Sequence, residues 1–150
     1  MERDQAIADY LAGLGVLDEL ARADPRALRQ RPADGGWPAA WVLHHLADSE
    51  LVNAVRLRRI LSEHEPALGS YDELAWADAL HYDARDPRHS AALVRLVRES
   101  NVSILHTLDE SGWRRFGVHH ESGVLTVDTW MRSLTQHLAG HVDQALVALG

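Results

Sequence analysis

The chain has 150 residues, a formal net charge of −7 and no cysteine. Its length is typical of one domain that buries a hydrophobic core, so we expect a single domain over residues 1–150. The acidic charge argues against binding to nucleic acid, and the lack of cysteine excludes disulfides and thiolate metal ligands. No stretch has the apolar character of a signal peptide or membrane span, so we expect a cytoplasmic protein that does not contact a membrane.

The first 63 residues predict two amphipathic helices. Apolar side chains recur at helical spacing over residues 4–23, and Asp24-Pro25 ends this pattern because the residue before a proline is disfavoured in a helix. A polar connector leads to Trp37-Pro38, where the proline suits the first turn of a second helix. We expect this second helix to continue to about Glu63.

The second half of the chain predicts two further helices with long connections. Residues 64–87 join the second helix to the third and contain a short helical segment over residues 71–77. The third helix is expected over residues 88–108. Its expected inward face consists of Leu93, Val97, Ile104 and Leu108. Residues 109–125 contain three glycines and predict a small hairpin, after which Thr126 can cap a last helix that reaches the C-terminus.

Four long amphipathic helices predict an all-α fold of the four-helix-bundle class. The long connection after the second helix allows the third helix to run parallel to it, whereas an up-down-up-down order would need only short loops. The predicted order is therefore up-down-down-up. The short segment in the 64–87 crossover adds an extra helix to this arrangement.

Helical geometry separates the ten histidines of the chain. His137 and His141 are four residues apart in the last helix and therefore project from the same face. In the second helix, His45 lies at the edge of the apolar arc, whereas its neighbour His44 is expected to point away from the core. Three histidines, His45, His137 and His141, can thus point into one bundle interior.

These three histidines form a candidate metal site. Three imidazoles with one open coordination position are a common catalytic arrangement for zinc, and imidazole also suits nickel and iron. A divalent ion of one of these metals is therefore the expected cofactor. The alternative is that the histidine pair of the last helix is structural or simply solvated, because a pair at this spacing also occurs without metal.

Glu50 is the candidate catalytic residue, and two interpretations of it stay open. It could be a fourth ligand, a hydrogen-bond partner of an imidazole, or a general base. Alternatively, it pairs with Arg56 or Arg58 on the surface. Asn53 and Asn101 are expected to form hydrogen bonds in the core and not to bind metal.

Five segments of the chain share a pattern with a known group of proteins. They are Gly36-Trp37-Pro38, residues 42–50, residues 71–76, His119-His120-Glu121-Ser122-Gly123 and residues 137–141. Together they resemble the DinB/YfiT-like superfamily of metal-binding four-helix bundles. The resemblance implies metal ligands at the histidine before Leu-Ala-Asp and at both histidines of the final His-x-x-x-His, which are His45, His137 and His141. One loop departs from the pattern, because relatives often have His-Pro-Glu-x-Gly where this chain has residues 119–123.

The resemblance also implies a homodimer and a small-molecule substrate. Some members of the family resemble transferases that use a low-molecular-weight thiol such as bacillithiol or mycothiol. We therefore predict a metal-dependent thiol S-transferase, in which Glu50 accepts the thiol proton or orients His45. Two alternatives stay open, namely a metal-dependent hydrolase that activates water and a non-catalytic metal-binding bundle.

Overall fold

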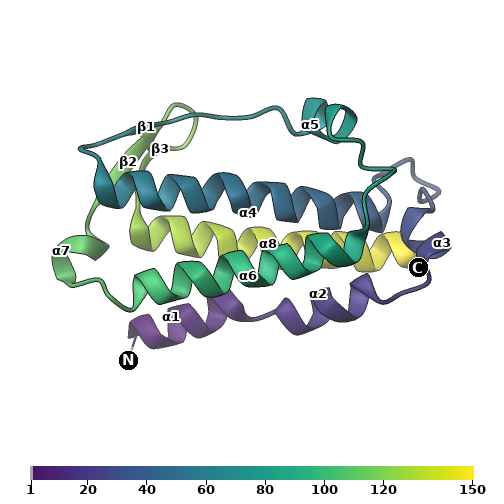
Figure 1. The fold of residues 1–150 in the computed structure, drawn as a ribbon, viewed down its shortest axis with the longest axis horizontal. Helices are drawn as coiled ribbons and strands as arrows, with labels where there is room; N and C mark the ends of the chain where they lie inside the picture. Colours follow the sequence, from purple (N-terminus) through teal and green to yellow (C-terminus); the bar gives the residue numbers. More distant parts are fainter. Residues whose placement is uncertain (1) are drawn as a thin grey trace.

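The computed structural model describes residues 2–150, which form mainly helices and one small sheet (Figure 1). Within these residues, no helix combines the length and apolarity that a bilayer span requires. The elements in chain order are α1 (Glu2–Leu11), α2 (Leu14–Ala21), α3 (Pro25–Arg29), α4 (Ala39–Ser62), β1 (Ala67–Leu68), α5 (Glu73–Ala79), α6 (Pro87–Leu105), α7 (Glu110–Trp113), β2 (Phe116–His119), β3 (Gly123–Thr126) and α8 (Val127–Leu149).

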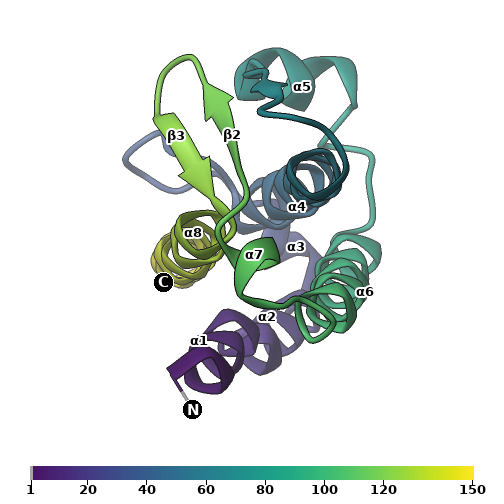
Figure 2. The same ribbon diagram turned by 90° about the vertical axis from the view of Figure 1, so that its left-hand side faces the viewer.

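The bundle consists of α4, α6, α8 and the pair α1–α2, as the end-on view in Figure 2 shows. In Figure 1, α4 and α6 run in the same direction, and α1–α2 and α8 run in the opposite direction. This is the predicted up-down-down-up order. Because α4 packs against both α6 and α8, side chains on different faces of α4 reach two different helices.

The first helix is broken in its middle, where the sequence predicts one continuous helix over residues 4–23. α1 ends at Leu11 and α2 begins at Leu14, with Gly13 between them in the left-handed conformation at φ 88°. Only glycine adopts this conformation without steric cost. A Cβ at Gly13 would lie at an ordinary packing distance of 3.6 Å from the Leu138 side chain, so the backbone conformation and not the contact with α8 favours glycine here.

The third helix buries a different face from the predicted one. The residues expected to face inward are only half-buried, and the buried face instead includes Val94, Arg98, Asn101 and Leu105. The prediction of this face was wrong because apolar periodicity counts only apolar side chains and therefore assigns an arginine such as Arg98 to solvent. The side chains of Arg98 and Asn101 are fully buried here because partners on other helices accept or donate their hydrogen bonds.

The crossover between α4 and α6 covers one side of α4 (Figure 1). It contains the predicted short helix α5, whose first turn is capped by the Asp72 carboxylate through the N–H groups of Leu74 and Ala75. The predicted hairpin is β2–β3. The sequence did not predict β1, which pairs in parallel with β2, whereas β2 and β3 pair antiparallel. Gly117 of β2 leaves room for Leu68, because a Cβ at this position would lie 2.9 Å from the Leu68 side chain.

The hydrophobic core is divided into two clusters. One surrounds α2 and the first half of α4, and the other surrounds α1, α7 and the start of α8. On α8, the last cluster residue on one side is Leu134 and the first on the other is Leu138, with His137 between them. A buried polar layer therefore lies at the middle of the bundle.

Candidate metal centre

The fold brings His45 of α4 together with His137 and His141 of α8. One ring nitrogen from each residue lies within 4.8 Å of the other two. The Nε2 atoms of His45 and His137 are 3.2 Å apart, and the ring centroids of His137 and His141 are 4.4 Å apart. Since the two helices pack together and the histidines of α8 are one turn apart, rigid backbone positions all three rings.

The environment keeps the imidazoles of His45 and His137 neutral. Burial, followed by the neighbouring His141, lowers the pKa of His45 to about 4. Burial, then His141, then His45, lowers the pKa of His137 to about 3. A neutral imidazole offers the lone pair that a metal ion requires, so neither residue has to lose a proton at neutral pH before it can act as a ligand.

The ring nitrogens that point away from the cluster have different surroundings. His141 Nδ1 lies 2.7 Å from Gln144 Oε1. His45 Nδ1 is buried without a hydrogen bond, and the nearest carboxylate oxygen of Glu73 is 3.6 Å away. His137 Nδ1 is buried and lacks a partner as well. Glu73 was missed as a site residue, although it lies in the family-like segment over residues 71–76.

The donor set fits a divalent ion. Across residues 2–150, the one group of metal-binding side chains at such short separations consists of these three histidines and includes no carboxylate. Two neutral imidazoles with Nε2 atoms 3.2 Å apart can share at most one hydrogen bond, and this bond does not involve His141. An ion bound there would have three protein ligands and at least one open position.

Glu50 is buried, and its carboxylate is paired with Arg98. Only 1% of it is exposed, and its Oε1 accepts hydrogen bonds from Arg98 Nε at 2.8 Å and Nη2 at 2.6 Å. The Tyr10 hydroxyl is 3.5 Å from the other carboxylate oxygen. The interpretation that Glu50 pairs on the surface with Arg56 or Arg58 is therefore wrong. Burial raises the pKa of Glu50, while the Arg98 charge opposes that shift.

His44 does not point into solvent as expected. It is fully buried, its Nδ1 lies 2.7 Å from Ser90 Oγ, and its ring packs against Tyr82. The prediction was wrong because α6 and the crossover cover the face of α4 opposite the histidine cluster. Asn53 and Asn101 form core hydrogen bonds as predicted, to the Ser49 carbonyl oxygen and the Tyr10 hydroxyl.

Aromatic rings border the candidate metal centre on the side of the crossover. Trp37 packs edge-on against His45 with ring centroids 5.6 Å apart, and Trp37 also contacts Trp41. Tyr71 of the crossover packs against Trp76 with centroids 4.5 Å apart. The Trp37 ring therefore covers part of His45, which is only 2% exposed.

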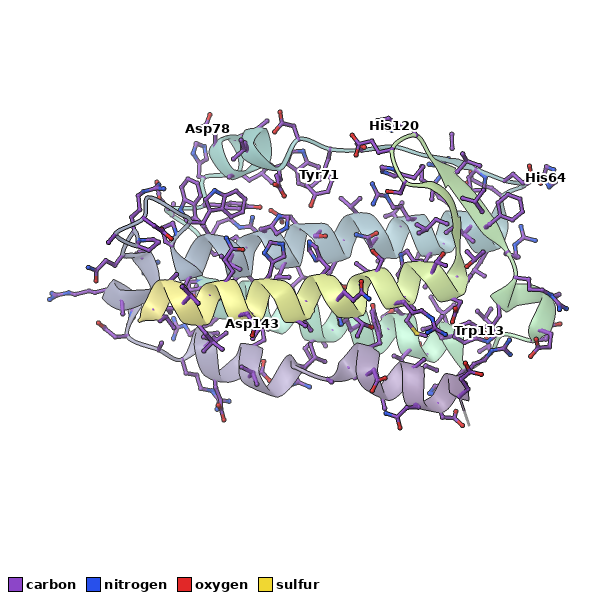
Figure 3. All side chains as sticks on the ribbon, turned by 180° about the vertical axis from the view of Figure 1, so that it is seen from behind. His64, Tyr71, Asp78, Trp113, His120 and Asp143 are labelled. Carbon is purple, nitrogen blue, oxygen red and sulfur yellow. The ribbon has the colours of Figure 1, made fainter. Side chains whose placement is uncertain are left out.

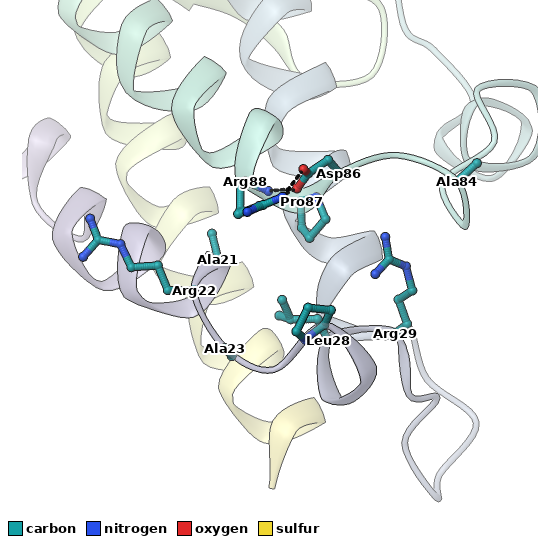
Figure 4. Close-up of a pocket in the computed structure, with 10 residues that line it drawn as sticks. Ala21, Arg22, Ala23, Leu28, Arg29, Ala84, Asp86, Pro87 and Arg88 are labelled. Carbon is teal, nitrogen blue, oxygen red and sulfur yellow. Dashed lines mark hydrogen bonds and ion pairs between the residues drawn. The ribbon is translucent and has the colours of Figure 1, made fainter.

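A separate pocket of about 470 Å³ lies at the end of the bundle (Figure 4). The loop around α3 and the start of α6 line it, and Arg22, Arg29 and Arg88 are among its residues. Figure 4 shows Arg88 paired with Asp86. None of the three clustered histidines lines this pocket.

The fold and this cluster define an up-down-down-up four-helix bundle with three histidines between its second and fourth long helices. The model of the DinB superfamily matches residues 12–145. The chain therefore belongs to the DinB superfamily, as its motifs predicted.

The most similar relatives include two proteins whose names propose a metal-dependent hydrolase. YfiT of Bacillus subtilis is 31% identical over 110 residues, which cover 73% of this chain and 62% of YfiT. OB0782 of Oceanobacillus iheyensis is 34% identical over 94 residues, which cover 62% of this chain and 54% of OB0782. The chain thus matches little more than half of the length of these relatives.

The solved structure of Bacillus subtilis YfiT has the same fold. It superimposes with a TM-score of 0.89 at 26% sequence identity and covers 97% of this chain and 84% of YfiT. That protein is described as a proposed metal-dependent hydrolase with an unusual four-helix-bundle topology. The likeness confirms the predicted fold class.

Proposed function

We propose that His45, His137 and His141 bind one divalent ion, and that the protein is a metal-dependent enzyme acting on a small molecule. The observation that carries this proposal is the convergence of three imidazoles, those of His45 and His137 kept neutral by burial, without a fourth side-chain ligand among residues 2–150. A structural metal site usually has all its positions filled by protein, whereas a catalytic site keeps one open. Zinc, nickel and iron all suit such a ligand set.

A bound ion would lower the pKa of a coordinated thiol or water molecule and so supply a nucleophile at neutral pH. The protein orients the ligands through Gln144, which contacts His141, and Glu73, which approaches His45. Such outer contacts select the tautomer and ring orientation of a ligating histidine.

We propose a low-molecular-weight thiol as the nucleophile and an electrophilic small molecule as its acceptor. The protein has no cysteine, so the thiol must come from a cosubstrate. Glu50, the predicted base, is not assigned the thiol proton in this proposal, because its carboxylate is paired with Arg98 and lies next to the Tyr10 hydroxyl. The Glu50→Gln variant keeps the shape of the side chain, and we expect it to leave metal content unchanged and to change turnover by less than about tenfold.

Metal analysis and a thiol-transfer assay test the proposal together. Purified protein reloaded with zinc, nickel or iron should contain about one ion per chain and should couple a small thiol to monochlorobimane. The His141→Ala variant should lose both properties. His106→Ala is the matched control, because His106 is exposed at the end of α6. Equal coupling by wild type and His141→Ala would exclude the metal-dependent mechanism.

Hydrolysis is the second candidate, and the names of the relatives favour it. In this case the open position would activate water, and the protein would hydrolyse esters or amides in the absence of any thiol. Turnover of such a panel that is lost in His141→Ala would select hydrolysis over thiol transfer. Stoichiometric metal without either activity would identify a non-catalytic metal-binding bundle.

We also propose that the protein forms a homodimer through the outer surface of α4 and α6. The side chains of Leu51, Val55 and Leu96 are 43%, 56% and 62% exposed, and all three line one groove. Val102 of α6 packs against the second core cluster and does not line this groove. Sedimentation of wild type and Leu96→Asp tests the proposal, because the charged variant should be monomeric.

A further inference from the structure

His119 stands at the end of β2, in the loop that departs from the family pattern, and is only 7% exposed. Its Nδ1 accepts the backbone N–H groups of Glu121 and Ser122, both at 3.2 Å. A neutral imidazole has one acceptor nitrogen and one N–H. The hairpin therefore fixes the tautomer of His119 with the hydrogen on Nε2.

This Nε2–H faces two side chains that come from different elements. Ser70 Oγ in the crossover lies 3.3 Å away, and Arg56 Nη2 of α4 lies 3.4 Å away. A guanidinium has donors and no acceptor, so the contact between Arg56 and His119 brings two N–H groups together. Such a pair of donors is stabilised when an oxygen that can accept from both lies against them.

Arg56 is held in place, yet part of its hydrogen-bonding capacity is unused. It donates from Nη1 to Asn53 Oδ1 at 3.3 Å and from Nη2 to the Gly69 carbonyl oxygen. Its Nε is buried and has no partner. No carboxylate within residues 2–150 forms an ion pair with Arg56, in contrast to Arg98, Arg85 and Arg59. The charge of a positioned, half-buried arginine is therefore not neutralised by the protein.

The same face of α4 carries both this cluster and the candidate metal centre. His45, Ser49, Asn53 and Arg56 follow one another at helical spacing. Between residues 45 and 56 the helix rises by about 16 Å, and the arginine side chain leans back toward the N-terminal end. Figure 3 shows Tyr71 extending from the crossover toward α4, where it interacts with Ser49. The polar face is thus covered by the crossover.

We propose that Arg56, His119 and Ser70 form a subsite for a small oxyanion, namely the carboxylate or phosphate group of a substrate or cosubstrate. Two N–H donors, one hydroxyl and one guanidinium charge match the acceptor oxygens of such a group. The link to a reacting atom at the three histidines rests on the proposed function above. Binding of the anion itself does not depend on a metal.

Calorimetric titration of the full chain with inorganic phosphate, and separately with acetate, tests the subsite. Wild type should bind at least one of the two anions, and the one that binds identifies the preferred group. Arg56→Gln should weaken this binding at least tenfold. His141→Ala should bind like wild type, which separates this subsite from the metal centre.

Two further variants keep the test decisive. Ser70 is exposed, so the Ser70→Ala substitution is expected to leave the fold intact. This variant should weaken anion binding about threefold. Arg22→Gln, in the pocket of Figure 4, is the matched control and should leave binding unchanged. Absence of binding to wild type, or binding lost in Arg22→Gln and retained in Arg56→Gln, would overturn the proposal.

Discussion

Two polar clusters lie between the helices of the bundle, and they differ in how their atoms are partnered. In the first, Glu50 accepts two hydrogen bonds from Arg98, and Arg98 also donates to the carbonyl oxygens of Tyr10 and Leu134. In the second, three imidazoles direct nitrogens at one another, and the Nδ1 atoms of His45 and His137 have no hydrogen bond.

The difference separates a structural cluster from a candidate binding site. Burying a polar group costs free energy unless it is paired. The cluster of Glu50 and Arg98 meets this requirement with side chains and backbone of the protein itself. The histidine cluster instead brings one ring nitrogen from each of three residues to within 4.8 Å of the others, an arrangement that a cation bound between them would stabilise.

Removing one member of the satisfied cluster should have the largest effect on stability. The Glu50→Ala variant leaves the fully buried Arg98 without its counter-charge, and we expect the free energy of unfolding to fall by about 3–5 kcal/mol. Urea denaturation measures the change. Glu63→Ala is the control, because Glu63 pairs with Arg59 in solvent and should change stability by less than about 1 kcal/mol. Equal losses of stability in the two variants would show that the buried pair of Glu50 and Arg98 stabilises the fold no more than an exposed ion pair does.

The metal-free histidine cluster should make stability depend on pH. Burial lowers the pKa of His45 to about 4 and that of His137 to about 3, whereas the unfolded chain protonates near 6.5. The unfolded state therefore binds more protons as the pH falls from 6.5 to about 4, and the free energy of unfolding decreases over this range. Each histidine contributes on the order of 1 kcal/mol per pH unit.

Urea denaturation of chelator-treated protein at several pH values measures this slope. His137→Leu should flatten the curve, because it removes the side chain whose pKa is lowered furthest. His106→Leu, at an exposed position, should leave the slope unchanged. A wild-type stability that rises as the pH falls from 6.5 to 4 would show that these imidazoles are already protonated in the folded protein.

Glu73→Gln should weaken metal binding without removing a ligand. The carboxylate approaches His45 Nδ1 from the crossover, and loss of such a partner typically costs at least about tenfold in metal affinity. Competition with a chromogenic chelator gives the affinity. The neighbouring Asp78→Asn, in the same short helix, serves as the control. If both variants bind metal like wild type, Glu73 does not support the site.

The smallest effect is expected from Gly140→Ala, between the two histidines of α8. A Cβ at this position meets no atom within 4 Å, and alanine is the better helix former. The free energy of unfolding should rise by about 0.5–1 kcal/mol, and metal stoichiometry should stay the same. Thermal denaturation and metal analysis check both. Loss of metal in this variant would mean that α8 must flex to bind it.

Much of the fold was predictable because it depends on local periodicity. The 3.6-residue repeat of apolar side chains predicts the long helices, and Thr126 caps α8 as expected, with its hydroxyl accepting the Thr129 N–H. The length of the crossover predicts the parallel course of α4 and α6. The same periodicity selected His45, His137 and His141, because facing helix positions follow from residue spacing within each helix.

Only the tertiary structure decided which polar groups are buried and with what partner. Arg98 and Glu50 are 48 residues apart in the sequence, and Arg56 and His119 are 63 apart, so no local pattern links either pair. A buried arginine looks like a surface residue until another helix supplies a carboxylate, which is why the inward face of α6 was predicted wrongly. Helix formation is a short-range property of the chain, whereas satisfaction of a buried polar group depends on long-range contacts made only when the helices pack.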